Sequence, residues 1–299
     1  MQEAGVRAFV GKLSMDLSSR PSYVESSAES SVISAASFAE KCSSLVSHLP
    51  LERRLVEPVI TPRFVPTCSN DLLSGLGRLS EEKGLRIQSH MAEAHDQVQW
   101  VEHERGMNDI DVFDRVSSKP VLQMVGFLNS LQNGLLTPRT IQAHCTFLNV
   151  SSLSRVFHRG TAIAHCPLSN AYFSAEPFRL REALHLGVKV GLGTDIAGGY
   201  SLDIMNAMRQ AVVVSRMREG SRVLSGNPDA VGVNNPGSES NSEWIEGQSL
   251  AVDWKEVLYL ATKCGMQALG LPVSWGTFAP GAPFDAQCSE QTALIHRFI

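Results

Sequence analysis

Short apolar segments alternate with longer stretches of helical periodicity along this chain. Each apolar segment is brief, is enriched in β-branched residues and is followed by polar residues, which favours a strand over a turn of buried helix. The chain is therefore predicted to contain strands at residues 7–13, 56–64, 85–90, 140–145, 161–166 and 188–195.

Helical patterns lie between these segments. Residues 69–82 begin at a capping candidate, Ser69 or Asn70, and are followed by Gly84, a common helix stop. Residues 202–217 and 254–269 show helical spacing of apolar residues. Residues 177–185 begin at a proline, which is common in the first turn of a helix. The Ser-rich residues 18–44 are interpreted as a helix with a loose approach. Residues 219–247 are polar and rich in Gly, Asn and Ser, and they predict a mobile surface insertion.

Alternation of strands and helices predicts parallel strands joined by helical crossovers, an α/β fold. A doubly wound sheet and a (β/α) barrel both satisfy this order. The barrel is favoured because polar and titratable residues recur at the C-terminal ends of four different strands. Barrel active sites are assembled from those ends.

Composition narrows the class of protein. The 299 residues are 43% hydrophobic and 19% charged, which is typical of a globular chain. The net charge of -4 argues against a nucleic-acid partner, because such surfaces are basic. No apolar run approaches the ~20 residues that span a membrane, and the N-terminal residues lack a basic signal start. The cysteines form no Cys-x-x-Cys pair, which indicates reduced thiols and a cytoplasmic location.

The densest candidate chemistry is in Ser89-His90-Met91-Ala92-Glu93. His90, at the tip of a strand, is suited to binding a divalent metal. Glu93, in the turn that follows, can lean over the same site and carry a proton. A hydrogen-bonded rim histidine and a solvated acid are the plainer alternative.

Two more histidines repeat this placement. His144 lies in Gln142-Ala143-His144-Cys145, and His165 lies in Ala164-His165-Cys166-Pro167. Histidines at three successive strand ends are hard to explain by packing alone, because imidazole is usually only partly buried. For His165 taken alone a structural role is favoured, and the following Pro167 and Asn170 indicate a shaped loop.

Asp195 closes the last predicted strand, with Gly193 before it and Gly198-Gly199 after it. A carboxylate at the end of an apolar strand needs a partner or a metal, although a helix cap is the alternative. The glycines permit the close approach of a ligand.

Arg63 and Phe64 end the second predicted strand. A guanidinium presents a planar fork to acceptor atoms, and a phenyl ring stacks on flat rings. Taken alone, a salt bridge and a core aromatic are the simpler interpretation.

Other chemistries lack their motifs. The chain has no Gly-x-Ser-x-Gly elbow and no phosphate-binding Gly-x-x-x-x-Gly-Lys. Gly191-x-Gly193 opens like a dinucleotide fingerprint, but Ile196 stands where the third glycine belongs. Here the spacing is His-x-x-Glu, unlike the His-x-Glu of one class of zinc nucleobase deaminases.

Taken together, the motifs resemble the amidohydrolase superfamily and, within it, the guanine deaminases. The most specific stretches are residues 163–170, Ile-Ala-His-Cys-Pro-x-Ser-Asn, and 188–201, which run through Thr194-Asp195 to Gly-Gly-Tyr-Ser. Residues 7–12 and 61–64 match as well. The resemblance extends from about Gly5 to Ala286.

The resemblance implies a role for each matched residue. His90 and Asp195 would be zinc ligands, and Glu93 would be the proton shuttle. His144 would face the reacting centre and touch the substrate, while Arg63 and Phe64 would hold the purine. Glu93, His144 and Asp195 would be the catalytic residues. The implied reaction is hydrolysis of guanine to xanthine and ammonia with Zn2+, and the implied assembly is a homodimer.

The chain departs from the family at its two ends. The family's first barrel strand carries a His-x-His pair with two more zinc ligands, and this chain has no His-x-His. The similarity begins at the family's third strand. We therefore expect an incomplete (β/α)8 TIM-type barrel that lacks the first strands and most of the small β-domain. Residues 1–271 would form the partial barrel, and residues 272–299 a remnant of that domain plus an unrelated tail.

Three functional hypotheses remain at this point. The first is a fragment of a guanine deaminase, whose activity on its own is not expected. The second is another amidohydrolase that deaminates a different heterocycle. The third is a non-catalytic remnant that binds a purine or a partner protein.

Overall fold

The computed structural model describes residues 2–281 apart from 4, 19, 116–133, 175, 226–247 and 278. Its centre is a curled sheet in which every pair of neighbouring strands is parallel, in the order β1-β3-β4-β5-β6-β7, with β2 beside β3. The strands are β1 (Ala8–Val10), β2 (Leu13–Ser14), β3 (Val56–Pro62), β4 (Arg86–Met91), β5 (Thr140–His144), β6 (Ala162–His165) and β7 (Val190–Leu192). All the predicted strands are present, and the first divides into β1 and β2.

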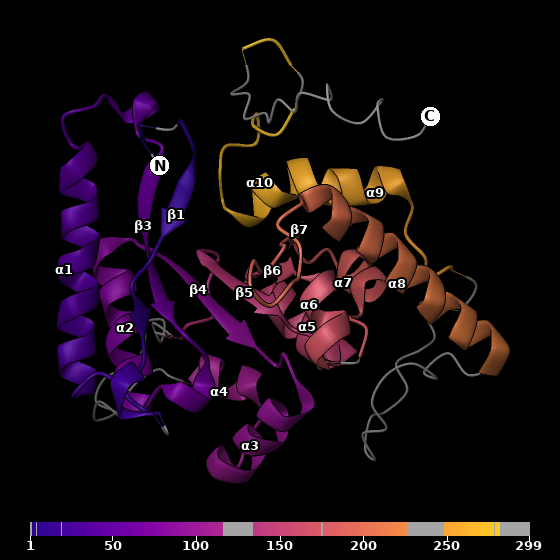
Figure 1. The fold of residues 1–299 in the computed structure, drawn as a ribbon, viewed down its shortest axis with the longest axis horizontal. Coiled ribbons are helices and arrows are strands. Elements are labelled where there is room, and N and C mark those ends of the chain that lie inside the picture. The colour runs from indigo at the N-terminus through magenta and orange to yellow at the C-terminus, as the bar shows by residue number, and fades with distance from the viewer. Residues whose placement is uncertain are drawn as a thin grey trace, which may run out of the picture.

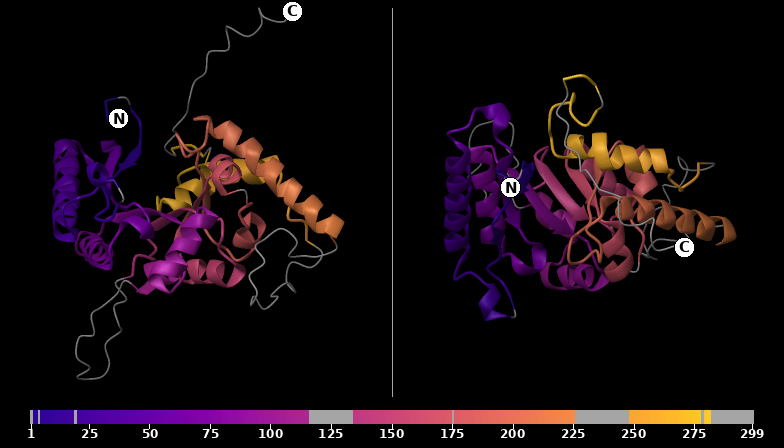
Figure 2. Two further views of the ribbon diagram at one scale, coloured as in Figure 1. Left: turned by 60° about the horizontal axis from the view of Figure 1, so that its bottom comes forward. Right: turned by 45° about the horizontal axis from the view of Figure 1, so that its top comes forward.

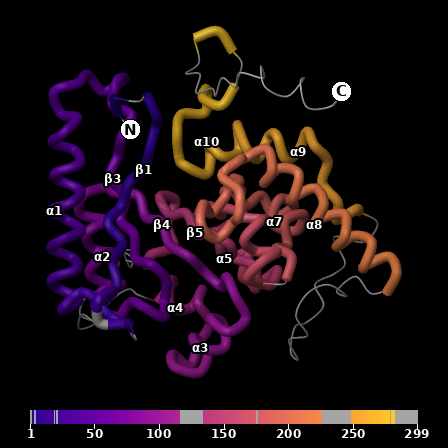
Figure 3. Tube along the Cα trace, viewed as in Figure 1, coloured from indigo at the N-terminus to yellow at the C-terminus, as the bar shows by residue number. Residues whose placement is uncertain are grey.

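The sheet follows the sequence around part of a barrel. Apart from the short β2, each strand lies beside its neighbours in chain order. The tube trace runs from the indigo N-terminal segments at one side to the orange helix at the other (Figure 3). Strands β1 and β7 end this order and do not pair with each other in the described residues. The fold is therefore an incomplete TIM-type barrel, and the doubly wound alternative is wrong because its strand order would reverse.

Helices cover the outer face of the sheet (Figure 1). At one end, α1 (Ala28–Val46) and α2 (Asn70–Lys83) pack against each other and against β3. At the other end, α8 (Ile204–Ser225) packs on α9 (Trp254–Tyr259), and α10 (Gly265–Ala268) contacts β7. Two turned views keep these groups apart, indigo at one side and orange to yellow at the other (Figure 2).

The remaining helices lie between these groups. Helices α3 (His95–Arg105) and α4 (Asp109–Arg115) follow β4, and α5 (Val150–His158) packs on α7 (Leu180–His185). The short α6 (Pro167–Ser169) runs into a π-helix, η4 (Asn170–Ser174), and a second π-helix, η5 (Leu260–Cys264), joins α9 to α10. Short 3-10 turns lie at Pro21–Tyr23, Leu51–Arg53 and Val65–Thr67.

Local sequence explains the helix ends. Ser69 accepts a hydrogen bond from the Leu72 N–H at the start of α2, and Gly84, with φ +64°, ends that helix. Asp253 and Glu256 form a reciprocal capping box at the start of α9. The ends at Ser69 and Gly84 are those that the sequence pattern predicts.

Several helix boundaries differ from the sequence prediction. Helix α1 runs from Ala28 to Val46, later than predicted, and α7 begins at Leu180. Residues 219–225, predicted as the start of a mobile insertion, are helical. Arg222 explains this extension, because its guanidinium pairs with Glu219 and donates to the Gln248 carbonyl. The rest of that insertion, 226–247, and the tail beyond 281 lie outside the described residues.

A helix that crosses a bilayer must be both long and apolar. None of the described helices meets both requirements for crossing a membrane.

Candidate active site

The C-terminal strand ends meet around one pocket of about 260 Å3. Every residue that the sequence singles out for metal, acid–base or substrate contact lines it. Two further residues join them, Phe173 and Gly198. The lining consists of Arg63, Phe64, His90, Glu93, His144, Phe173, Asp195 and Gly198.

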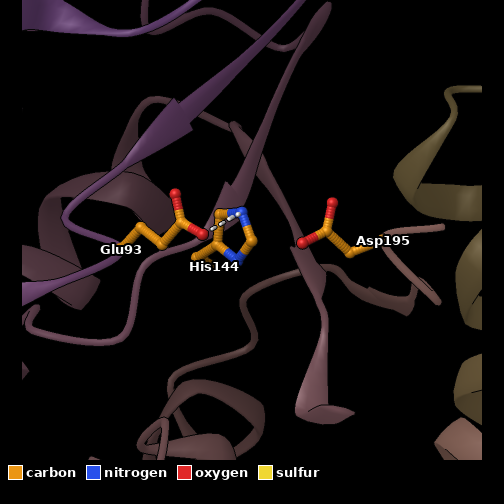
Figure 4. Close-up of side chains that lie close together, drawn as sticks. All are labelled: Glu93, His144 and Asp195. Carbon is orange, nitrogen blue, oxygen red and sulfur yellow. Dashed lines mark ion pairs between the residues drawn. The ribbon is translucent and has the colours of Figure 1, made fainter. Parts of the chain in front are cut away.

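Three of these side chains converge most closely. The ligand atoms of Glu93, His144 and Asp195 lie within 4.8 Å of one another, so they form a group that could hold a metal ion. His144 lies between the two carboxylates, and Glu93 approaches it from the turn after β4 (Figure 4). The distance from Oε1 of Glu93 to Nε2 of His144 is 3.5 Å. An imidazole and two carboxylates are a donor set that suits a divalent cation such as zinc.

His90 lines the same pocket, although it is not one of those three residues. Its Nδ1–H donates to the Arg63 carbonyl at 2.6 Å, which leaves Nε2 available as a ligand atom. Metal-ligating histidines usually fix their second nitrogen in this way. Burial lowers the pKa of His90, and the nearby His144 acts in the same direction. The unprotonated imidazole that a metal requires is therefore favoured.

His144 is the last residue of β5 and is almost fully buried, with 1% of its surface exposed. Its ring stacks on that of His90 with centroids 5.5 Å apart. Its Nδ1 lies 3.0 Å from Oδ1 of Asn170, in η4. The imidazole is thus held in one orientation at the floor of the pocket.

Asp195 lies on the turn after β7, with φ +55°. Gly198 comes so close to its carboxylate that a Cβ at position 198 would overlap Oδ2. A Cβ at Gly199 would overlap the Thr194 carbonyl in the same turn. The glycines therefore let the turn fold tightly beneath the Asp195 side chain.

Backbone strain gathers at the same rim. In the part of the chain that the structure describes, the non-glycine residues with positive φ are Ala92, His144, Cys145, Asp195 and Ile196. All of them end or closely follow strands β4, β5 and β7. Such conformations cost of order 1–3 kcal/mol each and persist where the surroundings fix them, often at functional sites.

Arg63 and Phe64 border the pocket at the end of β3. The Arg63 guanidinium carbon lies 5.0 Å from the centroid of the Phe64 ring. Both residues, together with Glu93 and Phe173, also line an adjoining cavity of about 1070 Å3. Neither side chain is a simple core or salt-bridge residue, because both face hollowed space.

His165 lies outside this lining. It is buried, its ring packs on Phe178 with centroids 5.0 Å apart, and burial lowers its pKa to about 3. The structural role that the sequence favoured for His165 fits these surroundings.

Phe173 lines the pocket although no motif in the sequence predicts a site role for it. It lies in η4, with half of its surface exposed, and no regular period places it beside Arg63. The supporting role of Asn170 was also missed, although the sequence marked its loop as shaped.

Comparison with known proteins places the chain in a family. The model of the amidohydrolase family matches residues 1–290. The chain belongs to the amidohydrolase family. This amidohydrolase is 34% identical over 298 residues to a probable guanine deaminase of Schizosaccharomyces pombe, covering 98% of this chain and 47% of the relative. It is 35% identical over 287 residues to the guanine deaminase of Homo sapiens, covering 94% of this chain and 52% of the relative.

A solved structure gives the same picture. The crystal structure of a guanine deaminase from C. acetobutylicum with bound guanine matches with a TM-score of 0.69 and 25% identity, covering 94% of this chain and 55% of that one. This amidohydrolase thus spans about half the length of the relatives it matches.

Proposed function

We propose that this amidohydrolase converts guanine to xanthine and ammonia by hydrolysis. The observation that carries the proposal is the convergence of Glu93, His144 and Asp195 in a pocket bordered by Arg63 and Phe64. Similarity to guanine deaminases over nearly the whole chain supports guanine as the substrate.

The imidazole and carboxylate groups that line the pocket are ligands that zinc commonly binds. We assign His90 and Asp195 as ligands, because both line the pocket and the Nδ1–H of His90 is fixed by a carbonyl, which leaves its Nε2 free to bind a metal. When bound, zinc would supply Lewis-acid activation of water. No further zinc ligand is assigned to this chain.

Glu93 is the group that moves protons in this proposal. Deamination needs one proton on a ring nitrogen when the amino-bearing carbon becomes tetrahedral, and another on the amine before it leaves. The Glu93 carboxylate lies beside His144 and within 4.8 Å of the Asp195 ligand atom. A carboxylate at that place can take one proton from the attacking water and pass it to the ring nitrogen. It can then take a second proton from the new hydroxyl group and pass it to the amine, which leaves as ammonia when the C–N bond breaks.

The other lining residues bind and orient the substrate. Phe64 offers a flat face for stacking on the purine, and the Arg63 guanidinium offers donors to its acceptor atoms. His144 faces the same space from the floor, where it can contact the reacting end of the ring.

The cellular location and the assembly of the protein are also proposals. The described cysteines are all free and buried, which supports a reducing compartment such as the cytoplasm. A homodimer and the division at residue 271 remain predictions from the resemblance.

Turnover of guanine by the purified chain tests the proposal. With added Zn2+ we expect xanthine, measured by chromatography, and equimolar ammonia. Glu93→Gln should lower kcat by about 100-fold or more, whereas the exposed Glu82→Gln should leave it unchanged. Absence of xanthine formation by the purified chain with Zn2+ would contradict the proposal.

A further inference from the structure

The turn that carries Glu93 is held by two buried polar side chains that the proposed mechanism does not use. Strand β4 ends at Met91, and Ala92 and Glu93 follow at the rim of the pocket. Ala92 has φ +46°, a conformation that costs energy for a residue with a Cβ. The position of the Glu93 carboxylate therefore depends on what fixes this turn.

Hydrogen bonds link the turn to Gln97 and Asp109 in succession. The Glu93 N–H donates to Oε1 of Gln97 at 3.2 Å, and Nε2 of Gln97 donates to Oδ1 of Asp109 at 2.9 Å. Burial raises the pKa of Asp109 to about 6, against hydrogen bonds from Gln97 and the Ala92 backbone that lower it. The Glu93 N–H is thus received by the Gln97 amide, which is itself held by the Asp109 carboxylate.

Both side chains of this network are buried, so its hydrogen bonds are costly to break. Gln97 is 8% exposed and Asp109 is 2% exposed. A hydrogen bond lost at such a depth leaves a group without a partner, which costs about 1–3 kcal/mol. Gln97 lies in α3 and Asp109 begins α4, so the network ties the turn to two helices. On another side, the Ser174 hydroxyl in η4 donates to the Glu93 carbonyl.

We propose that Gln97 and Asp109 are positioning residues that set the place of the Glu93 carboxylate in the pocket. They act through the backbone N–H of Glu93 rather than by touching the reacting atoms. The proposal rests on the proposed function, because it concerns the group assigned there to move protons.

Exchange of the two polar groups tests the network. Gln97→Glu sets a carboxylate against that of Asp109. Asp109→Asn replaces the charged acceptor of the Gln97 amide by a weaker neutral one and brings an NH2 group into the same buried site. The double variant restores complementarity, since a carboxylate at position 97 accepts from Glu93 and from the new amide at position 109. Each single variant should lower kcat about 10–100-fold with KM for guanine unchanged, and the double variant should recover most of kcat.

A matched control and a second readout keep the test decisive. Gln99→Glu makes the same chemical change on the exposed side of α3 and should leave kcat unchanged. Amide hydrogen exchange at Glu93 should be faster in each single variant and slow again in the double variant. Unchanged kcat in the single variants, or no recovery in the double variant, would overturn the proposal. If the wild-type chain forms no xanthine, the proposed function fails, and equal exchange at Glu93 in all variants then overturns the network.

Discussion

Asn170 orients His144 through a hydrogen bond of 3.0 Å between its Oδ1 and Nδ1 of the imidazole. An amide oxygen only accepts, so Nδ1 carries the hydrogen and Nε2 presents a lone pair to the pocket. The facing atom, Oε1 of Glu93, lies 3.5 Å away and is itself an acceptor when ionised. A proton or a cation between Nε2 of His144 and Oε1 of Glu93 would stabilise these two facing acceptors. By fixing the imidazole, Asn170 therefore prepares this side of the pocket to hold a proton or a cation.

Removing that acceptor should impair the proposed reaction. Asn170→Leu frees the imidazole to rotate or to change tautomer, and we expect deamination to fall about 10–100-fold. Asn170→Asp keeps an acceptor at the same place and should retain most of the activity. The 15N chemical shifts of His144 should report Nδ1–H in the wild type and in Asn170→Asp, and a mixture in Asn170→Leu. Equal losses in the two variants would show that the hydrogen bond does not matter.

Gly198 should be needed for the position of Asp195. A Cβ at Gly198 would overlap Oδ2 of Asp195, so Gly198→Ala should displace the carboxylate from the pocket. We expect zinc affinity and activity to fall by about tenfold or more, as when a ligand's support is altered. Gly220→Ala is the matched control, because nothing lies within 4 Å of its added Cβ in the α8 helix. That control should keep activity and raise the unfolding free energy by up to about 1 kcal/mol. Normal zinc binding in Gly198→Ala would contradict the geometric argument.

The strands and the chemistry at their ends could be predicted from the sequence. Brief β-branched runs that end in His90, His144 or Asp195 combine a local period with a polar tip, and both signals lie within a few residues. Because parallel strands share one carboxyl edge, a barrel necessarily brings such tips together. The pocket lining agrees with this expectation.

The residues that surround the site and hold its side chains in place could not be predicted in this way. Asn170, Phe173 and Ser174 lie in a π-helix, whose spacing matches neither the helical nor the strand period. Gln97 lies on α3 and Asp109 on α4, and their side chains meet because these two helices pack against each other. Such contacts depend on tertiary packing, which leaves no periodic trace in one sequence.

Zinc should stabilise the folded chain through Asp195. A ligand that binds only the folded state adds RT ln(1 + [L]/Kd), about 2.7 kcal/mol at a concentration 100 times Kd. Asp195→Asn should remove most of this gain, whereas Asp71→Asn, at an exposed position in the first turn of α2, should keep it. Urea unfolding with Zn2+ and with a chelator measures the difference. The same zinc-dependent gain in Asp195→Asn would contradict the assignment of this ligand.

His165 should make the folded chain less stable in mild acid. Burial lowers its pKa to about 3 from an unfolded value near 6.5, and the nearby His144 acts in the same direction. Between these values the unfolded chain binds the extra proton, so this residue's contribution falls as pH falls from about 6.5 toward 3, by at most about 1.4 kcal/mol per pH unit. Above pH 6.5 the contribution is constant. His165→Gln cannot gain this proton, so its unfolding free energy should depend less on pH over that range, whereas the exposed His48→Gln should follow the wild type. Identical slopes for wild type and His165→Gln in urea titrations between pH 4 and 7 would show that folding does not lower the pKa of His165.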